Sequence, residues 1–157
     1  MEPTLKGLRT AVTGDAAGHG RALADQLAAG GAHIAYCTLH AGDAAMAVQA
    51  LSEHGTHVTV TSTNLADGAA LARWVNAAAQ DFGGLDLVIC SLGEAPAAAA
   101  LGLLRAARPH LLSSAMKGFV QVGSDGTLAE QAEGLRFEAM AAGEAAAPLL
   151  ARLAAPA

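Results

Sequence analysis

Short apolar runs alternate with longer segments of helical spacing along the chain. Strands are expected at residues 8–12, 33–37, 57–61, 85–90 and 118–122. Helices are expected at residues 21–29, 43–53, 66–82, 97–114 and 128–154, several of them ended by glycine. Apolar strands joined by helices favour parallel pairing with right-handed crossovers. The pattern therefore predicts an α/β fold, a doubly wound parallel sheet of about five strands in the order 3-2-1-4-5.

Composition narrows the class of protein. No linker or charge block divides the 157 residues, so we expect a single domain. Hydrophobic residues make up 53% of the chain and aromatic ones only 3%, which suits an aliphatic core between helices and a sheet. The formal net charge is −5 and the basic residues are scattered singly, which argues against a nucleic-acid partner. Because neither a membrane-spanning stretch nor a secretory signal is recognised, we expect a cytoplasmic protein.

Cysteine and histidine usage gives no sign of a disulfide or a metal centre. Cys37 and Cys90 fall on predicted strands that are separated by another strand, so a disulfide would have to cross about two strand spacings of ~4.8 Å. The histidines lack the spacing of metal ligands. We therefore expect two buried thiols and no metal.

A glycine-rich loop lies between the first expected strand and the first helix. Thr13 is followed by glycines at 14, 18 and 20, a pattern that lets the backbone approach a pyrophosphate at a helix N-terminus. The segments AVTGDAAGHGRALADQLAAGGAHIA, NLAD, DFGGLDLVICSLG and GFVQVGS follow in that order. Together they resemble the short-chain dehydrogenase/reductase family, whose TGxxxGxG motif is matched at every fixed position.

The resemblance implies a Rossmann-type crevice for NAD or NADP and a small-molecule substrate. The residues expected at the cofactor are Gly14, Gly18, His19, Gly20, Thr38, Asn64, Leu65 and Gly93. Thr38, Leu39 and His40 end the second strand without the acidic residue or arginine that would distinguish NAD from NADP. Asp15 adds negative charge to the glycine loop, so we expect dinucleotide binding to be weak or absent.

Departures from the family pattern affect the catalytic groups. The family's Asn-Asn-Ala-Gly corresponds to Cys90-Ser91-Leu92-Gly93, and its catalytic serine corresponds to Ser124. The tyrosine of the YxxxK motif, about a dozen residues further on, falls on Phe137, and the lysine falls on Ala141. Phenylalanine has no hydroxyl to donate or accept a proton. The chain resembles a truncated family member that lacks the last two strands and the acid–base pair.

Two residues could still support chemistry in the crevice. His19 lies in the glycine loop, and the resemblance would bring it near Ser124, Ser91 and a carboxylate. A histidine titrates near neutral pH and could act as an acid or base there. The alternatives are a solvent-facing or cofactor-packing His19 and a turn-capping Ser124 hydroxyl.

Three functions follow from these observations. The first is a non-reducing accessory or pseudo-enzyme subunit with a residual dinucleotide crevice. The second is an enzyme that reuses the crevice for dehydration, cyclisation or isomerisation through His19 and Ser124. The third is an NAD(P)-dependent reductase with an unrecognised acid.

Self-association is also expected. Without the last two strands, residues 119–122 would form an open sheet edge without Lys or Pro, which proteins normally pair or protect. Residues 97–100 and 139–142 would place small side chains on the flanking helices. We expect a homodimer, or a hetero-oligomer with a longer relative that supplies the missing groups.

Overall fold

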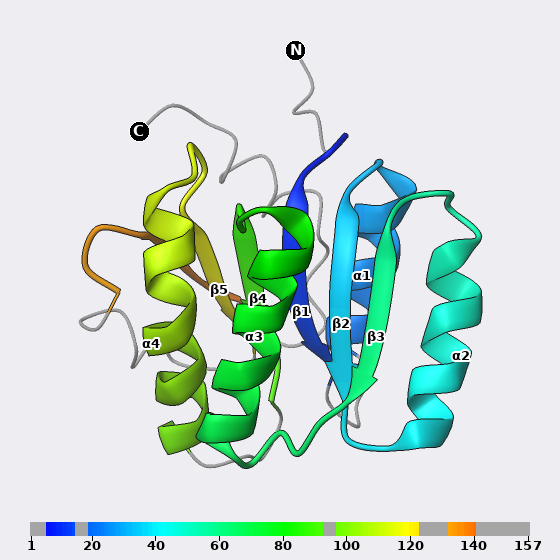
Figure 1. The fold of residues 1–157 in the computed structure, drawn as a ribbon, viewed down its shortest axis with the longest axis horizontal. Coiled ribbons are helices and arrows are strands. Elements are labelled where there is room, and N and C mark those ends of the chain that lie inside the picture. The colour runs from blue at the N-terminus through cyan, green and yellow to red at the C-terminus, as the bar shows by residue number, and fades with distance from the viewer. Residues whose placement is uncertain (1–5, 15–18, 93–96, 123–131, 141–157) are drawn as a thin grey trace.

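A computed structural model of the protein describes residues 6–14, 19–92, 97–122 and 132–140 (Figure 1). The strands are β1 Arg9–Gly14, β2 His33–Thr38, β3 Val58–Ser62, β4 Leu87–Cys90, β5 Gly118–Val122 and β6 Arg136–Met140. The helices are α1 His19–Ala29, α2 Ala41–Ser52, α3 Gly68–Phe82 and α4 Ala97–Leu112. The strands form one parallel sheet in the order β3-β2-β1-β4-β5-β6.

Helices cover both faces of this sheet, as the apolar strands require. Figure 1 shows α3 and α4 in front of the sheet and α1 behind it. On the α3–α4 side, Ala11, Val88 and Phe119 pack with Leu71, Leu103 and other buried residues. On the opposite side, Val12, Ile34 and Ile89 pack with Leu23 and Leu27 of α1. Alternate residues of the central strands β1, β2, β4 and β5 therefore contribute to separate clusters.

Local sequence explains where α3 begins and ends. The Asp67 carboxylate accepts hydrogen bonds from the amides of Ala69 and Ala70, which caps the first turn. Gly83 ends the helix at φ 77°, a left-handed conformation that glycine adopts without strain. The chain then turns directly into the segment that leads to β4.

Small residues let α3 and α4 approach closely. A Cβ atom at Gly102 would lie 2.9 Å from the Cα of Gly68, closer than real side chains pack. Ala99 and Ala100 of α4 are also buried, in the core cluster between the sheet and α3 and α4. These alanines, which we expected to serve an interface with another chain, pack against α3 within this one. None of the helices in the described segments is long and apolar enough to cross a membrane.

The C-terminal region contains a sixth strand where a helix was expected. We expected a helix over residues 128–154, but Arg136–Met140 forms β6 and pairs in parallel with β5. Phe137 therefore lies on a strand, and its ring stacks on Phe119 with centroids 6.1 Å apart. Ala139, expected on a helix, is also on this strand, and Ala141 lies outside the described residues. The register that equated Phe137 with a helical tyrosine position is wrong.

Pairing with β6 also covers the edge of β5. Every residue of β5 has a partner on β6, from Gly118 with Arg136 to Val122 with Met140. The expected open edge at residues 119–122 is therefore wrong, and the sheet contains one strand more than we expected. The outermost strands among the described residues are β3 and β6.

Candidate functional site

The candidate site lies at the carboxyl ends of the parallel strands, which all meet at one edge of the sheet. Gly14 ends β1 level with Thr38 of β2, and Thr38 is level with Ser62 of β3. The direction of winding reverses between β1 and β4, which is where ligands bind in open α/β sheets. The loops predicted to bind a dinucleotide follow β1, β2, β3 and β4 at this edge.

Two glycines of the predicted motif are required by packing. A Cβ at Gly14 would overlap the hydroxyl of Tyr36, which is buried between β2 and α1. A Cβ at Gly20 would overlap the carbonyl oxygen of Thr13, so this glycine lets α1 begin against the end of β1. The closely packed turn expected from the sequence is present, while Gly18 lies outside the described residues.

Thr13 connects the ends of the two central strands. Its hydroxyl accepts a hydrogen bond from the Ser91 amide at 2.7 Å and donates to the Ser91 carbonyl oxygen at 3.1 Å. Thr13 and Ser91 are both fully buried. The Ser91 side-chain hydroxyl, in contrast, has no hydrogen-bond partner in the structure described. An unpaired buried hydroxyl costs free energy, so a ligand group that gained access to it would satisfy a hydrogen bond.

The sequence pointed to only part of this contact. Ser91 was placed in the crevice by the family register, but neither its unpaired hydroxyl nor its contact with Thr13 was predicted. The two residues are far apart in sequence. The one available signal for Thr13 was its position immediately before the glycines of the motif.

The segment at the end of β2, residues 38–40, has no side chain that would set a preference between NAD and NADP. Thr38 is buried, and its carbonyl oxygen accepts from the Thr63 amide at 2.8 Å. Leu39 is exposed, and its carbonyl oxygen accepts from the Ser62 hydroxyl at 3.1 Å. His40 is exposed at the start of α2 and makes no side-chain cap. These contacts join the ends of β2 and β3.

The two residues predicted after β3 differ in exposure. The Asn64 side-chain oxygen accepts from the Ala66 amide at 3.0 Å and holds the turn into α3. Leu65 is buried with Leu71 and Trp74. Asn64 therefore presents its amide nitrogen at the surface, whereas only the backbone of Leu65 could reach a ligand.

Only His19 of the predicted pair, His19 and Ser124, lies within the described residues. His19 is the first residue of α1 and is partly buried, at the carboxyl edge of the sheet. Ser124, Gly93 and Asp15 lie outside the described residues. The juxtaposition of His19 with Ser124 stays a prediction.

The expected buried thiols are present. Cys37 on β2 and Cys90 on β4 are free and buried on either side of β1. Burial raises the pKa of Cys90 to about 12, and burial together with the neighbouring Cys90 raises the pKa of Cys37. Both thiols therefore stay protonated at neutral pH and are poor nucleophiles. Across the described segments, no group of three or more metal-ligating side chains is present.

The comparisons with known proteins agree with this geometry. The family model for short chain dehydrogenases matches residues 9–127, from the start of β1 to beyond β5. The chain belongs to the short chain dehydrogenase family. No curated protein sequence gives a significant match. The family match includes the glycine turn, the Thr13–Ser91 contact and both loops that border β2.

Solved structures of dehydrogenases and reductases share the fold. An NADH-dependent reductase responsible for alginate metabolism is 22% identical with a TM-score of 0.69, covering 87% of this chain and 77% of that one. L-sorbose reductase from Gluconobacter frateurii is 23% identical with a TM-score of 0.69, covering 80% of this chain and 55% of that one. Carveol dehydrogenase from Mycobacterium avium is 20% identical with a TM-score of 0.63, covering 79% and 57%. The chain spans little more than half the length of the last two.

Proposed function

We propose that this short chain dehydrogenase family member binds a nicotinamide dinucleotide weakly and does not reduce carbonyl compounds, acting instead as an accessory or pseudo-enzyme subunit. Several relatives of the same fold were solved with NAD, or with NADPH and L-sorbose. The packed glycine turn at the carboxyl end of β1 supports a retained crevice in this chain.

The absence of reductase activity is proposed from the connection between β5 and β6. In the family, the helix with the YxxxK motif follows the fifth strand and precedes the later strands. Here residues 123–135 join β5 to β6, and they read GSDGTLAEQAEGL, with neither tyrosine nor lysine. Phe137 stacks on Phe119 in the sheet, and the one tyrosine of the sequence, Tyr36, is buried beside Gly14. No side chain of the family's acid–base type is supplied at this point.

The expected consequence for rate is large. Proton transfer by a positioned side chain contributes typically 10²–10⁴-fold to an enzymatic rate. A serine at position 124 would polarise a carbonyl but would leave its oxygen without a proton donor. Bound cofactor alone should therefore give negligible carbonyl reduction.

Weak cofactor binding is supported by the end of β2. Thr38 is buried, and its carbonyl oxygen already accepts a hydrogen bond from the amide of Thr63, just after β3. Leu39 and His40 offer neither a carboxylate for the ribose hydroxyls nor a permanent cation for a 2′-phosphate. We expect NAD and NADP to bind with similar affinity.

The test separates binding from chemistry. NADH and NADPH oxidation is followed with a panel of ketones and aldehydes, and dinucleotide binding is measured independently by calorimetry. We expect binding without turnover. Turnover above about 1 s⁻¹, within the normal enzymatic range, would overturn the non-reducing role.

Ser91 provides a sharper test of the crevice. Ser91→Ala removes the unpaired hydroxyl and should weaken dinucleotide binding about fivefold, which corresponds to one hydrogen bond of ~1 kcal/mol. Thr56→Ala is the matched control, because the Thr56 hydroxyl oxygen is also buried without a partner but lies before β3, at the opposite edge of the sheet. Equal effects of the two substitutions would argue against a ligand at Ser91.

A further inference from the structure

A groove follows the side of β3 that faces α3. Its main hollow has a volume of about 400 Å³ and lies between the carboxyl end of β3 and the first half of α3. A second hollow of about 230 Å³ continues toward the start of β3, and Thr61, Trp74 and Ala77 line both. Pockets for small ligands begin at about 300 Å³, so the main hollow is large enough for a compact molecule. It contains none of the glycine-turn residues.

The polar groups of the main hollow are hydrogen-bond donors or hydroxyls. Arg73 is exposed at its rim and makes no hydrogen bond or ion pair within the described segments. The Asn64 oxygen is held by the Ala66 amide, so the side-chain nitrogen remains as a donor. The hydroxyls of Thr61 and Thr63 complete this side.

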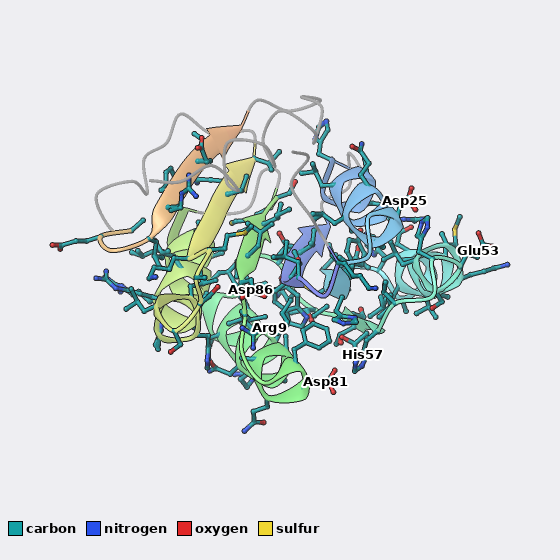
Figure 2. The ribbon with its side chains drawn as sticks, turned by 90° about the horizontal axis from the view of Figure 1, so that it is seen from above. Arg9, Asp25, Glu53, His57, Asp81 and Asp86 are labelled. Carbon is teal, nitrogen blue, oxygen red and sulfur yellow. The ribbon has the colours of Figure 1, made fainter. Side chains whose placement is uncertain are left out.

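Charge selects the type of ligand. No aspartate or glutamate lines the main hollow, although the chain carries a net charge of −5. Two carboxylates lie near it: Asp67 accepts a hydrogen bond from the amide of the lining residue Ala70 at 3.3 Å, and Asp81 lines the second hollow and pairs with His57 at 3.2 Å (Figure 2). A single arginine without a second cation fits a monoanion, and a guanidinium matches the two oxygens of a carboxylate.

The remaining wall is apolar. Trp74 is largely buried between α3 and the sheet, and Ala70 and Ala77 flank it on the helix. Trp74 is 7% exposed and adds a small aromatic surface to this wall, against which a ligand ring can pack. The groove therefore combines an apolar wall with one cationic rim.

We propose that the β3–α3 groove is a binding site for a small aromatic carboxylate, held by Arg73 and Asn64 at its carboxylate and by Trp74 at its ring. The site shares Asn64 with the predicted dinucleotide crevice but contains none of the glycine-turn residues, and it does not rest on the proposed function. The Ser62–Leu39 and Thr63–Thr38 hydrogen bonds connect its β3 wall to the end of β2.

The test uses Trp74 as a reporter, because it is the one tryptophan in the sequence. Benzoate, benzyl alcohol and acetate are titrated without cofactor while the single indole N–H resonance is followed by NMR. We expect benzoate to shift this resonance saturably. Benzyl alcohol, which lacks the charge, and acetate, which lacks the ring, should bind more weakly.

Two arginine variants separate the site from general charge effects. Arg73→Gln should weaken benzoate binding about five- to tenfold, as the loss of a charge-assisted contact predicts, and leave benzyl alcohol unchanged. Arg105→Gln on α4 is the control, since Arg105 is also exposed but does not line the groove. Unchanged benzoate affinity in Arg73→Gln, equal losses in both variants, or equal affinity for benzoate and benzyl alcohol would each overturn the proposal.

Discussion

Replacing Asp86 should destabilise the protein, because this carboxylate joins three segments of the sheet. It accepts hydrogen bonds from the Arg9 amide at 3.0 Å, from Arg9 Nε at 3.1 Å and from Arg9 Nη2 at 3.0 Å. The Ser114 hydroxyl donates to it at 2.6 Å from the segment before β5. Figure 2 shows Arg9 and Asp86 side by side. Asp86→Asn keeps an acceptor oxygen but removes the charge.

Partial exposure sets the expected magnitude. The side chains of Arg9 and Asp86 are 31% and 17% exposed, so solvent screens the pair in part. Breaking a buried pair costs about 3–5 kcal/mol, and an exposed pair contributes about 0–1 kcal/mol. We expect Asp86→Asn to lower the free energy of unfolding by about 2 kcal/mol at pH 7. Arg9 would keep its bond to the Gly83 carbonyl oxygen at 3.0 Å.

The loss should depend on pH in a definite direction. Burial alone would raise the pKa of Asp86, but the hydrogen bonds from Arg9 and Ser114 outweigh it and lower the pKa below 3.8. An unfolded aspartate titrates near pH ~3.9. The stabilisation is therefore complete above the unfolded pKa and disappears as pH falls through the folded pKa.

Urea unfolding at pH 7, 5 and 3 measures this dependence. The difference between the wild type and Asp86→Asn should be constant at pH 7 and 5 and smaller at pH 3. Glu53→Gln is the control, because Glu53 is exposed at the end of α2 without an ion pair among the described residues. A difference that persists unchanged at pH 3, or that is absent at pH 7, would refute the role of the charged carboxylate.

Three further outcomes are expected. A double-mutant cycle of Phe119→Ala and Phe137→Ala should give a coupling energy of about 1 kcal/mol in urea unfolding, because the rings stack; zero coupling would contradict the placement of β6. Cys37 and Cys90 should react with a disulfide reagent at pH 8 only at the rate of unfolding, since both are buried. Self-association, first expected from an open β5 edge, now rests on β6 as the outermost strand on that side of the described sheet, and a stable 15.5 kDa monomer in light scattering would contradict it.

Much of the fold could be predicted because each strand has its own local signal. The run near residue 8 became β1, Arg9–Gly14, and the run at 33–37 became β2, His33–Thr38. Each strand has buried apolar residues at its centre, Ala11 and Val12 in β1 and residues 34–37 in β2, and is bounded by glycine or polar residues. Parallel order then followed from the helical segments between the strands and from the right-handed crossover. These features need no information about distant contacts.

The sixth strand was missed although its pattern is present. From Leu135 to Met140 apolar and polar residues alternate up to Ala139, which is typical of a strand with one exposed face. The surrounding alanine-rich sequence favoured a helix on composition. Pairing with β5 decides the outcome, because it buries one side of Phe137 against Phe119.

The site was predictable only where the family motif covers it. The glycine turn was found from spacing, but the unpaired Ser91 hydroxyl depends on how β1 and β4 meet across the sheet. The β3–α3 groove likewise depends on which flank of α3 faces the outer strand. No pattern along the chain encodes either arrangement, because both arise from tertiary packing.

Because Phe137 lies on β6, the expected lack of reductase activity has a different cause from the one that the sequence suggested. Counting from Ser124 aligned Phe137 with the family's tyrosine and Ala141 with its lysine, so the loss of activity looked like two point substitutions. In the structure Phe137 packs within the sheet, so Phe137→Tyr combined with Ala141→Lys would place the hydroxyl against Phe119 rather than at a substrate. We therefore expect this double variant to stay inactive with NADH and NADPH in the carbonyl panel. Restored turnover would mean that residues 136–140 adopt the helix expected from the sequence.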